Sequence, residues 1–131
     1  MDRLRVFIVD DNFVARHGLR SILEAEAGIS IVGEASTGIE AIQCLSKTEA
    51  DIILMDIRMP DLSGIEVTMS LLRRQPLVRV LIMTVVEDPI ILASAILAGA
   101  RGYLSYGHFN PDTLVESLRL IAKGKVVMIP P

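Results

Sequence analysis

Short apolar runs of strand length recur along the chain, and each is followed by polar residues and a segment with helical periodicity. The runs are Val6 to Val9, Ile52 to Met55, Val78 to Met83 and Gly102 to Leu104, and Ser30 to Ala35 alternates weakly as a further strand. Strands that are apolar throughout are typical of a parallel sheet covered on both faces. The alternation therefore predicts an α/β fold in which five strands and five helices form a three-layer sandwich with right-handed crossovers.

The helical segments carry their own start and stop signals. Asn12, Asp88 and Asn110 are predicted N-caps, and Ser63 with Glu66 forms a capping box. The residues expected to face the sheet are Ala15, Gly18, Leu19, Ile22 and Leu23, then Ile39, Ile42 and Leu45, then Ile65, Met69 and Leu72, and finally Leu114, Leu118 and Ile121. Gly28, Gly99 and Gly124 are expected to end the first, fourth and last helices.

The composition argues against a nucleic-acid-binding protein and against a membrane protein. The chain has 131 residues, enough for one domain with a core of its own, and a formal charge of −3 with its basic residues scattered. Such a chain is not expected to bind nucleic acid by itself. It contains no apolar run of membrane-spanning length, so we expect a cytoplasmic protein without membrane contact. Cys44, its single cysteine, is expected to be a packed apolar residue.

Carboxylates follow two of the predicted strands. Asp10 and Asp11 follow the first, and Asp56 ends the third within the sequence Met55-Asp-Ile-Arg-Met-Pro60. In the flavodoxin-like strand order 2-1-3-4-5, the first and third strands are neighbours at the switch point where ligands bind. The three acids are therefore expected to meet, with Thr84 on the adjoining strand end. A plain helix-capping role for Asp56 is the alternative, but Asp61 and Ser63 are available for that task.

Three carboxylates in one crevice repel one another unless they are protonated or bind a cation. A hard divalent cation such as Mg²⁺ suits oxygen ligands, whereas the lack of His and Cys at this place argues against zinc. A carboxylate can also attack phosphorus and form an aspartyl phosphate, to which the Thr84 hydroxyl can donate a hydrogen bond. These residues therefore suit a divalent-cation site, and they also allow phosphoryl chemistry at a carboxylate.

Together with Gly99-Ala-Arg-Gly-Tyr-Leu104, these motifs resemble the receiver domain of bacterial two-component response regulators, over about residues 4 to 124. The greatest similarity is to the NarL-type branch, whose members carry a LuxR-type helix-turn-helix after a CheY-like receiver. The resemblance implies a domain that is not an enzyme beyond its own phosphorylation and dephosphorylation. It also implies a histidine kinase as partner and control of an output, in this branch transcription.

The resemblance further implies roles for single residues. Asp56 is the phosphoacceptor, and Asp10, Asp11 and Asp56 hold Mg²⁺ together with the backbone carbonyl of Arg58. Thr84 is the switch hydroxyl and Tyr103 is the switch aromatic residue that turns inward with it. Arg58 and Val86 fall at the two variable positions that tune the lifetime of the phosphoryl group.

One departure from the family pattern bears on all these roles. Receivers place a lysine three residues after the switch aromatic, and this chain has Tyr106 there, with no lysine between Lys47 and Lys123. The missing ammonium group would attract a phosphoryl group by about 4 kcal/mol at contact distance and an effective dielectric constant near 20. Two hypotheses follow: phosphorylation persists in weakened form, helped by Arg58 or His108, or the domain acts as a dimerisation or ligand-binding module without phosphate.

The segment from Ile90 to Ala98 has Ser94 as its single polar side chain, whereas a helix on a sheet needs one apolar stripe. It predicts either a wide core contact or an interface, and the resemblance implies a homodimer through the fourth helix, fifth strand and fifth helix.

His17 is expected to be an ordinary surface or packing residue. Residues 125–131 are expected to begin a linker, with DNA bound only through a further C-terminal domain.

A hypothesis of another class is an enzyme of the aspartate-nucleophile phosphatase type, which would also use Asp10 and Mg²⁺. Asp10-Asp11-Asn12 lacks the Asp-x-Asp spacing of those enzymes, and the chain has no cap domain to enclose a substrate. Turnover of a generic phosphate ester would support this hypothesis.

Overall fold

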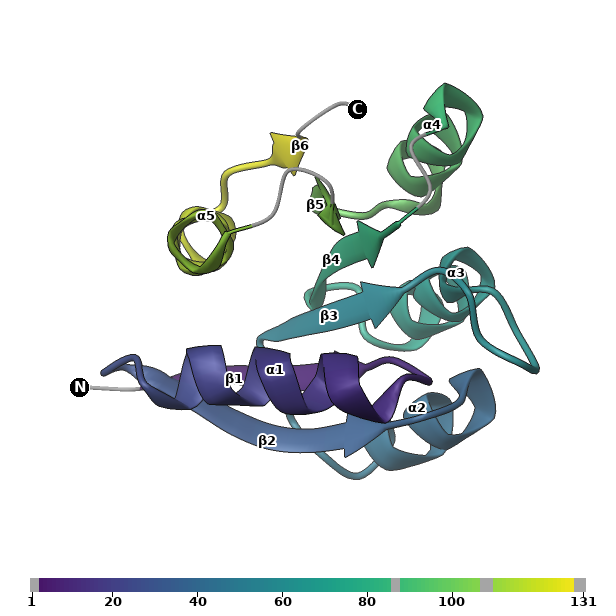
Figure 1. Cartoon of the computed structure of the whole chain (residues 1–131). Coiled ribbons are helices and arrows are strands. Elements are labelled where there is room, and N and C mark those ends of the chain that lie inside the picture. The colour runs from purple at the N-terminus through teal and green to yellow at the C-terminus, as the bar shows by residue number, and fades with distance from the viewer. Residues whose placement is uncertain (1–2, 86–87, 107–109, 129–131) are drawn as a thin grey trace.

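The computed structural model describes residues 3–85, 88–106 and 110–128. Within these ranges the chain forms one six-stranded sheet of order β2-β1-β3-β4-β5-β6 (Figure 1), in which all neighbours are parallel. The strands are β1 (Leu4–Val9), β2 (Ile29–Ala35), β3 (Ile52–Asp56), β4 (Arg79–Thr84), β5 (Gly102–Ser105) and β6 (Val127–Met128). The predicted flavodoxin-like order is therefore confirmed, with one strand more than expected.

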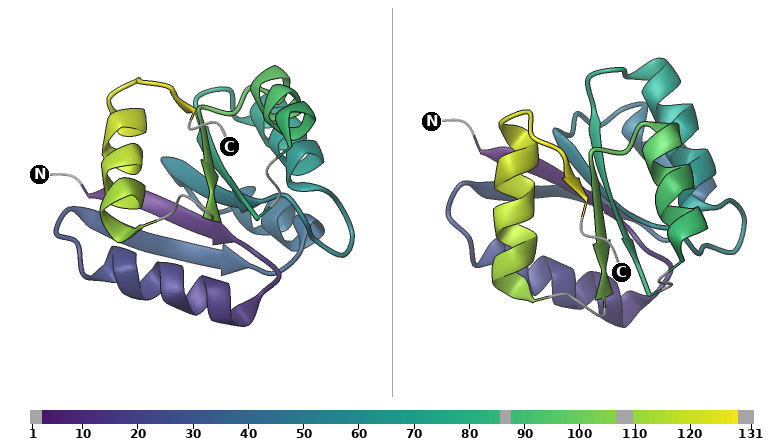
Figure 2. Two further views of the ribbon diagram at one scale, coloured as in Figure 1. Left: turned by 45° about the horizontal axis from the view of Figure 1, so that its top comes forward. Right: turned by 90° about the horizontal axis from the view of Figure 1, so that it is seen from above.

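Helices cover both faces of the sheet (Figure 2). They are α1 (Phe13–Glu24), α2 (Gly38–Leu45), α3 (Gly64–Arg74), α4 (Pro89–Ala98) and α5 (Pro111–Ala122). One apolar cluster joins the sheet to α1 and α5, and a second joins it to α2, α3 and α4. Neighbouring residues of a strand belong to opposite clusters: in β3, Ile53 and Met55 face α2 to α4, while Ile52 and Leu54 face α1 and α5. This arrangement explains why the central strand β3 is apolar without interruption from Ile52 to Met55.

The predicted N-caps are present. The side chains of Asn12, Asp88 and Asn110 accept backbone N–H bonds in the first turns of α1, α4 and α5, and Ser63 and Glu66 form the capping box of α3. Gly99 ends α4 in a left-handed conformation with φ of 98°. The first helix ends at Glu24 rather than at Gly28, because Gly28, with φ of 87°, belongs to the turn that leads into β2.

Three of the residues expected to face the sheet, Gly18, Ile39 and Met69, lie at exposed helix positions instead. The exposed fraction is 52% for Ile39 and 44% for Met69. In α2 the buried residues are instead Gly38, Ala41 and Leu45. In α3 they are Gly64, Val67, Thr68 and Leu71, because Gly64 packs directly on the backbone of Asp56 and so fixes which side of the helix faces the sheet. This close approach leaves no signal in the apolar pattern.

The extra strand comes from the segment that was expected to begin a linker. The Val127 N–H donates to the carbonyl of Arg101 at 2.9 Å, and Val127 and Met128 pack against the two opposite apolar clusters. The tail therefore covers the outer edge of β5. Among the described residues, none of the helices has both the length and the apolar character needed to cross a membrane.

Candidate functional site: an acidic pocket at the carboxyl ends of β1 and β3

The structure brings Asp10, Asp11 and Asp56 together. Asp10 and Asp11 follow β1, Asp56 is the last residue of β3, and these two strands are neighbours in the sheet. One carboxylate oxygen from each residue lies within 4.8 Å of the other two. Asp10 is buried, Asp56 is partly buried and Asp11 is exposed. The acids open into a pocket of about 440 Å³ lined by Asp10, Asp11, Asn12, Ala15, Asp56, Arg58, Thr84, Val85 and Tyr106.

Asp10 is held from three sides. One of its carboxylate oxygens accepts the backbone N–H of Asn12 at 2.8 Å, and the other accepts the hydroxyl of Tyr106 at 3.3 Å. The guanidinium group of Arg16 donates to the backbone carbonyl of Asp10, and its Nε atom donates to Glu34 at 3.2 Å. Arg16 thus ties α1 and β2 to the site, a role that no motif in the sequence indicated.

The charges in the pocket are poorly balanced. Burial, followed by the neighbouring charges of Asp10 and Asp11, raises the pKa of Asp56 to about 7. Burial also raises the pKa of Asp10, against the opposing effect of its bonds from Asn12 and Tyr106. These directions are those of acids that lack a matching cation. Oxygen donors of this kind fit a hard divalent cation of the size of Mg²⁺.

The loop after β3 is shaped by Gly64 and Asp61, whose contacts with other elements the sequence did not indicate. A Cβ atom on Gly64 would lie 2.0 Å from the backbone oxygen of Asp56, so only glycine fits at the first residue of α3. Asp61 accepts the backbone N–H groups of Gly38 and Ile39, so it caps α2 rather than α3. Both contacts fix the chain that follows Asp56 against the neighbouring helices.

The remaining predicted residues lie at different depths. Thr84 ends β4, is buried, and lines the pocket. Tyr103 is fully buried within the apolar cluster beneath α2 to α4. Arg58 is exposed at the mouth of the pocket.

His17 is exposed on α1 and stacks on Phe13 with ring centroids 6.2 Å apart. Val86 and His108 lie outside the described residues.

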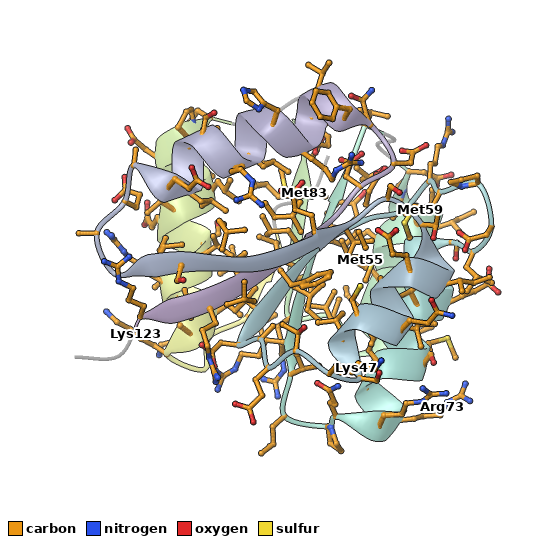
Figure 3. The ribbon with its side chains drawn as sticks, turned by 90° about the horizontal axis from the view of Figure 1, so that it is seen from below. Lys47, Met55, Met59, Arg73, Met83 and Lys123 are labelled. Atoms are coloured by element: carbon orange, nitrogen blue, oxygen red, sulfur yellow. The ribbon has the colours of Figure 1, made fainter. Side chains whose placement is uncertain are left out.

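Tyr106 is the residue at whose position the sequence resemblance implies a lysine. It is partly buried, and burial together with the charges of Asp10 and Asp56 raises its pKa, so its hydroxyl remains protonated. Figure 3 shows Lys123 at the opposite end of the sheet from Met59, which lies in the loop after β3, and the lining of the pocket contains no lysine among the described residues. The pocket therefore receives a neutral hydrogen-bond donor where an ammonium group was expected.

Comparison with known proteins shows which family the chain resembles. Residues 6–119 match the response regulator receiver domain family. The chain is 37% identical over 122 residues to the response regulator UvrY of Escherichia coli K12, covering 93% of this chain and 56% of that protein. It is 32% identical over 129 residues to the transcriptional regulatory protein DegU of Brevibacillus brevis, covering 98% and 54%. The chain thus spans about half the length of these relatives.

Comparison with solved structures also finds response regulators. The crystal structure of a LuxR-family two-component response regulator from Aurantimonas sp. SI85-9A1 superposes with a TM-score of 0.92 at 32% identity, covering 98% of this chain and 91% of that one. The sequence match extends over most of the chain and includes both acidic strand ends. The chain therefore belongs to the family of response regulator receiver domains.

Proposed function

We propose that this receiver domain takes up a phosphoryl group on Asp56 and thereby controls an output, transcription being the one that the relatives' names suggest. The observation that carries the proposal is the convergence of Asp10, Asp11 and Asp56 in one pocket beside Thr84. A resident Mg²⁺ ion held by these acids and the carbonyl of Arg58 would supply positive charge to offset that of the transferring group.

In the proposed reaction a carboxylate oxygen of Asp56 attacks phosphorus. The bond from phosphorus to a histidine nitrogen of the partner kinase breaks, and the imidazole leaves with the electron pair and takes up a proton. Because the cation-free Asp56 has a pKa of about 7, much of it is protonated and not nucleophilic at neutral pH. Thr84, buried at the end of the adjoining strand, is placed to donate its hydroxyl to a phosphoryl oxygen.

A phosphate analogue tests this step directly. With Mg²⁺ and beryllofluoride we expect amide signals around Asp56 and Thr84 to shift, and acetyl phosphate with Mg²⁺ to add the mass of one phosphoryl group. The Asp56→Asn variant should show neither effect. A wild-type protein that stays unchanged in both assays at millimolar reagent would contradict phosphoryl uptake.

A second possible function is association without phosphate, and two observations favour it. Tyr106 supplies no positive charge to a phosphoryl group, and Tyr103 is already fully buried, the inward position that the family resemblance connects with the switched state. On this hypothesis the domain holds its associating form in the resting state. Dimerisation that is equally strong with and without beryllofluoride would favour it over the first.

In both cases the associating face is proposed to be α4, β5 and α5, used by two copies of this chain. In α4 only Ala95 is buried, and the exposed fractions are 74% for Ile90, 51% for Ile96 and 87% for Leu97. The Ser94 hydroxyl donates its hydrogen to the Ile90 carbonyl within the helix, so that donor is already used. Strand β6 lies along the sheet edge between α4 and α5 (Figure 1), so it would take part in the contact.

Sedimentation can test this face with a matched pair of variants. Leu97→Asp should convert a dimer to a monomer, because it places a charge in the apolar patch. Leu77→Asp is the control, since Leu77 is equally exposed at 91% but lies between α3 and β4. A protein that is monomeric at high concentration, or variants that dissociate equally, would contradict the proposed interface.

A further inference from the structure

Tyr106 and Asp10 form a contact that the family pattern does not explain. The Tyr106 hydroxyl donates to one Asp10 carboxylate oxygen at 3.3 Å, while the other oxygen accepts the Asn12 N–H at 2.8 Å. Asp10 is 4% exposed, and its backbone carbonyl is bound by Arg16. Its carboxylate is therefore fixed in the plane set by these two donors. Each oxygen keeps a further lone pair for another ligand.

We propose that Tyr106 is a positioning residue for the divalent-cation site, a role that rests on the proposed function of the pocket. Its hydroxyl orients the Asp10 carboxylate toward Asp11 and Asp56, much as outer-shell donors orient the carboxylates of other metal sites. Because this donor is neutral, it fixes the ligand without cancelling the negative charge that attracts the cation. A lysine at this place would oppose the cation by its own charge.

A residue at position 106 can affect two properties of the pocket: its affinity for a divalent cation and its attraction for a phosphoryl group. The tyrosine favours cation binding and contributes nothing to the attraction of a phosphoryl group. The site should therefore bind a divalent cation firmly in the absence of phosphate. Replacement by lysine should weaken cation binding and strengthen the response to beryllofluoride, whereas replacement by phenylalanine should weaken cation binding alone.

The test is a titration with Mn²⁺, in which the electron paramagnetic resonance of the free ion reports binding without any phosphoryl reagent. We expect about a tenfold weaker affinity for Tyr106→Phe, as for the loss of other outer-shell donors, and a loss of at least about tenfold for Tyr106→Lys. Ser46→Ala is the control: it removes a hydroxyl bonded to the Gln43 carbonyl at 2.6 Å at the end of α2, outside the pocket. It should bind Mn²⁺ like the wild type.

A spectroscopic signal distinguishes positioning from general loss of structure. The chain has two tyrosines and no tryptophan, so its tyrosine fluorescence is directly observable. Mg²⁺ should change this emission with the midpoint found by competition against Mn²⁺, and Tyr106→Phe should abolish the change. Wild-type Mn²⁺ affinity in Tyr106→Phe would overturn the role of Tyr106 and leave the pocket's proposed function intact. Failure of the wild type to bind Mn²⁺ would overturn both.

Discussion

Asp51 and Asp56 flank the same strand, one before β3 and the other at its end, yet the protein treats their charges in opposite ways. Asp51 accepts the backbone N–H of Arg5 at 2.8 Å and two bonds from the Arg5 guanidinium group. These contacts lower its pKa. Asp56 lies among Asp10 and Asp11, and burial together with their charges raises its pKa to about 7. One carboxylate is matched with a cation and the other is not.

The difference separates a structural edge of the sheet from a functional one. At the amino ends of the strands, Asp51 joins β1 to β3 through Arg5 and stabilises the fold. At the carboxyl ends, the guanidinium group of Arg16 is directed to a backbone carbonyl and to Glu34, so its charge offsets that of Asp10 only in small part. The unbalanced charge costs stability and makes the pocket a receptor for a cation.

The largest expected effect comes from Gly64→Ala, which alters only the carboxyl edge. The new Cβ atom would meet the Asp56 oxygen at 2.0 Å and Met55 Cγ at 2.9 Å, so strand and helix must separate. We expect the free energy of unfolding to fall by about 3 kcal/mol. Urea denaturation measures it, and Mn²⁺ affinity should fall with it because Asp56 moves.

Gly18→Ala serves as the matched control for that substitution. Gly18 lies within α1, and a Cβ atom there would meet nothing within 4 Å. Alanine should therefore stabilise the helix, by about 0.5 to 1 kcal/mol. If Gly64→Ala were as stable as Gly18→Ala, the close packing of α3 on Asp56 would be wrong.

The next effect is that of Asp56→Asn in a buffer with a chelator at pH 8. The shift of the Asp56 pKa from 3.8 to about 7 disfavours the charged form, and removal of that charge should stabilise the protein. After a discount for the solvent that reaches the partly exposed group, we expect a gain of about 1.5 kcal/mol in the free energy of unfolding. Mg²⁺ should narrow the gap by binding to the wild type.

The stability difference between the wild type and Asp56→Asn should depend on pH. Since the pKa of Asp56 is raised in the folded state, the contribution of Asp56 to the free energy of unfolding is fully present below its unfolded pKa. That contribution is lost as pH rises through about 7. The wild type should therefore lose stability relative to Asp56→Asn between about pH 4 and pH 8. A constant difference across that window would show that Asp56 does not carry an unbalanced charge.

The acidic half of this contrast could be predicted from the sequence, because strand order alone brings residues at the ends of β1 and β3 together. The pairing of Asp51 with Arg5 was not predicted. The N-caps were equally predictable, since Asn12 and Ser63 act within their own helices. Contacts between elements were not: Arg16 reaches Asp10, Asp61 caps α2, and Gly64 meets Asp56 only after packing. The misassigned faces at Ile39 and Met69 have the same origin, because packing between elements set the rotation of those helices.

A smaller effect of opposite sign is expected at the amino edge. Asp51→Asn removes the charge that binds the Arg5 side chain but retains an oxygen for the Arg5 N–H. Near neutral pH we expect a loss of about 1 kcal/mol, since the pair is partly exposed. Because the pKa of Asp51 is lowered, the loss should disappear as pH falls through that lowered value. A stabilised Asp51→Asn variant would remove the contrast with Asp56.

The smallest effect is expected for Glu49→Gln. This substitution tests whether any negative charge near Arg5 stabilises the amino edge of the sheet as well as Asp51 does. Glu49 also contacts the Arg5 guanidinium group, at 2.8 Å, but its side chain is 87% exposed. Water screens such a pair and the side chains lose conformational freedom in forming it, so Glu49→Gln should shift the melting temperature by no more than about 2 °C. Calorimetry of both variants in one buffer makes the comparison. An equal loss from Glu49→Gln would mean that net charge rather than the bonds to the β1 backbone stabilises this edge, and the same argument would then apply to the unbalanced acids at the other end.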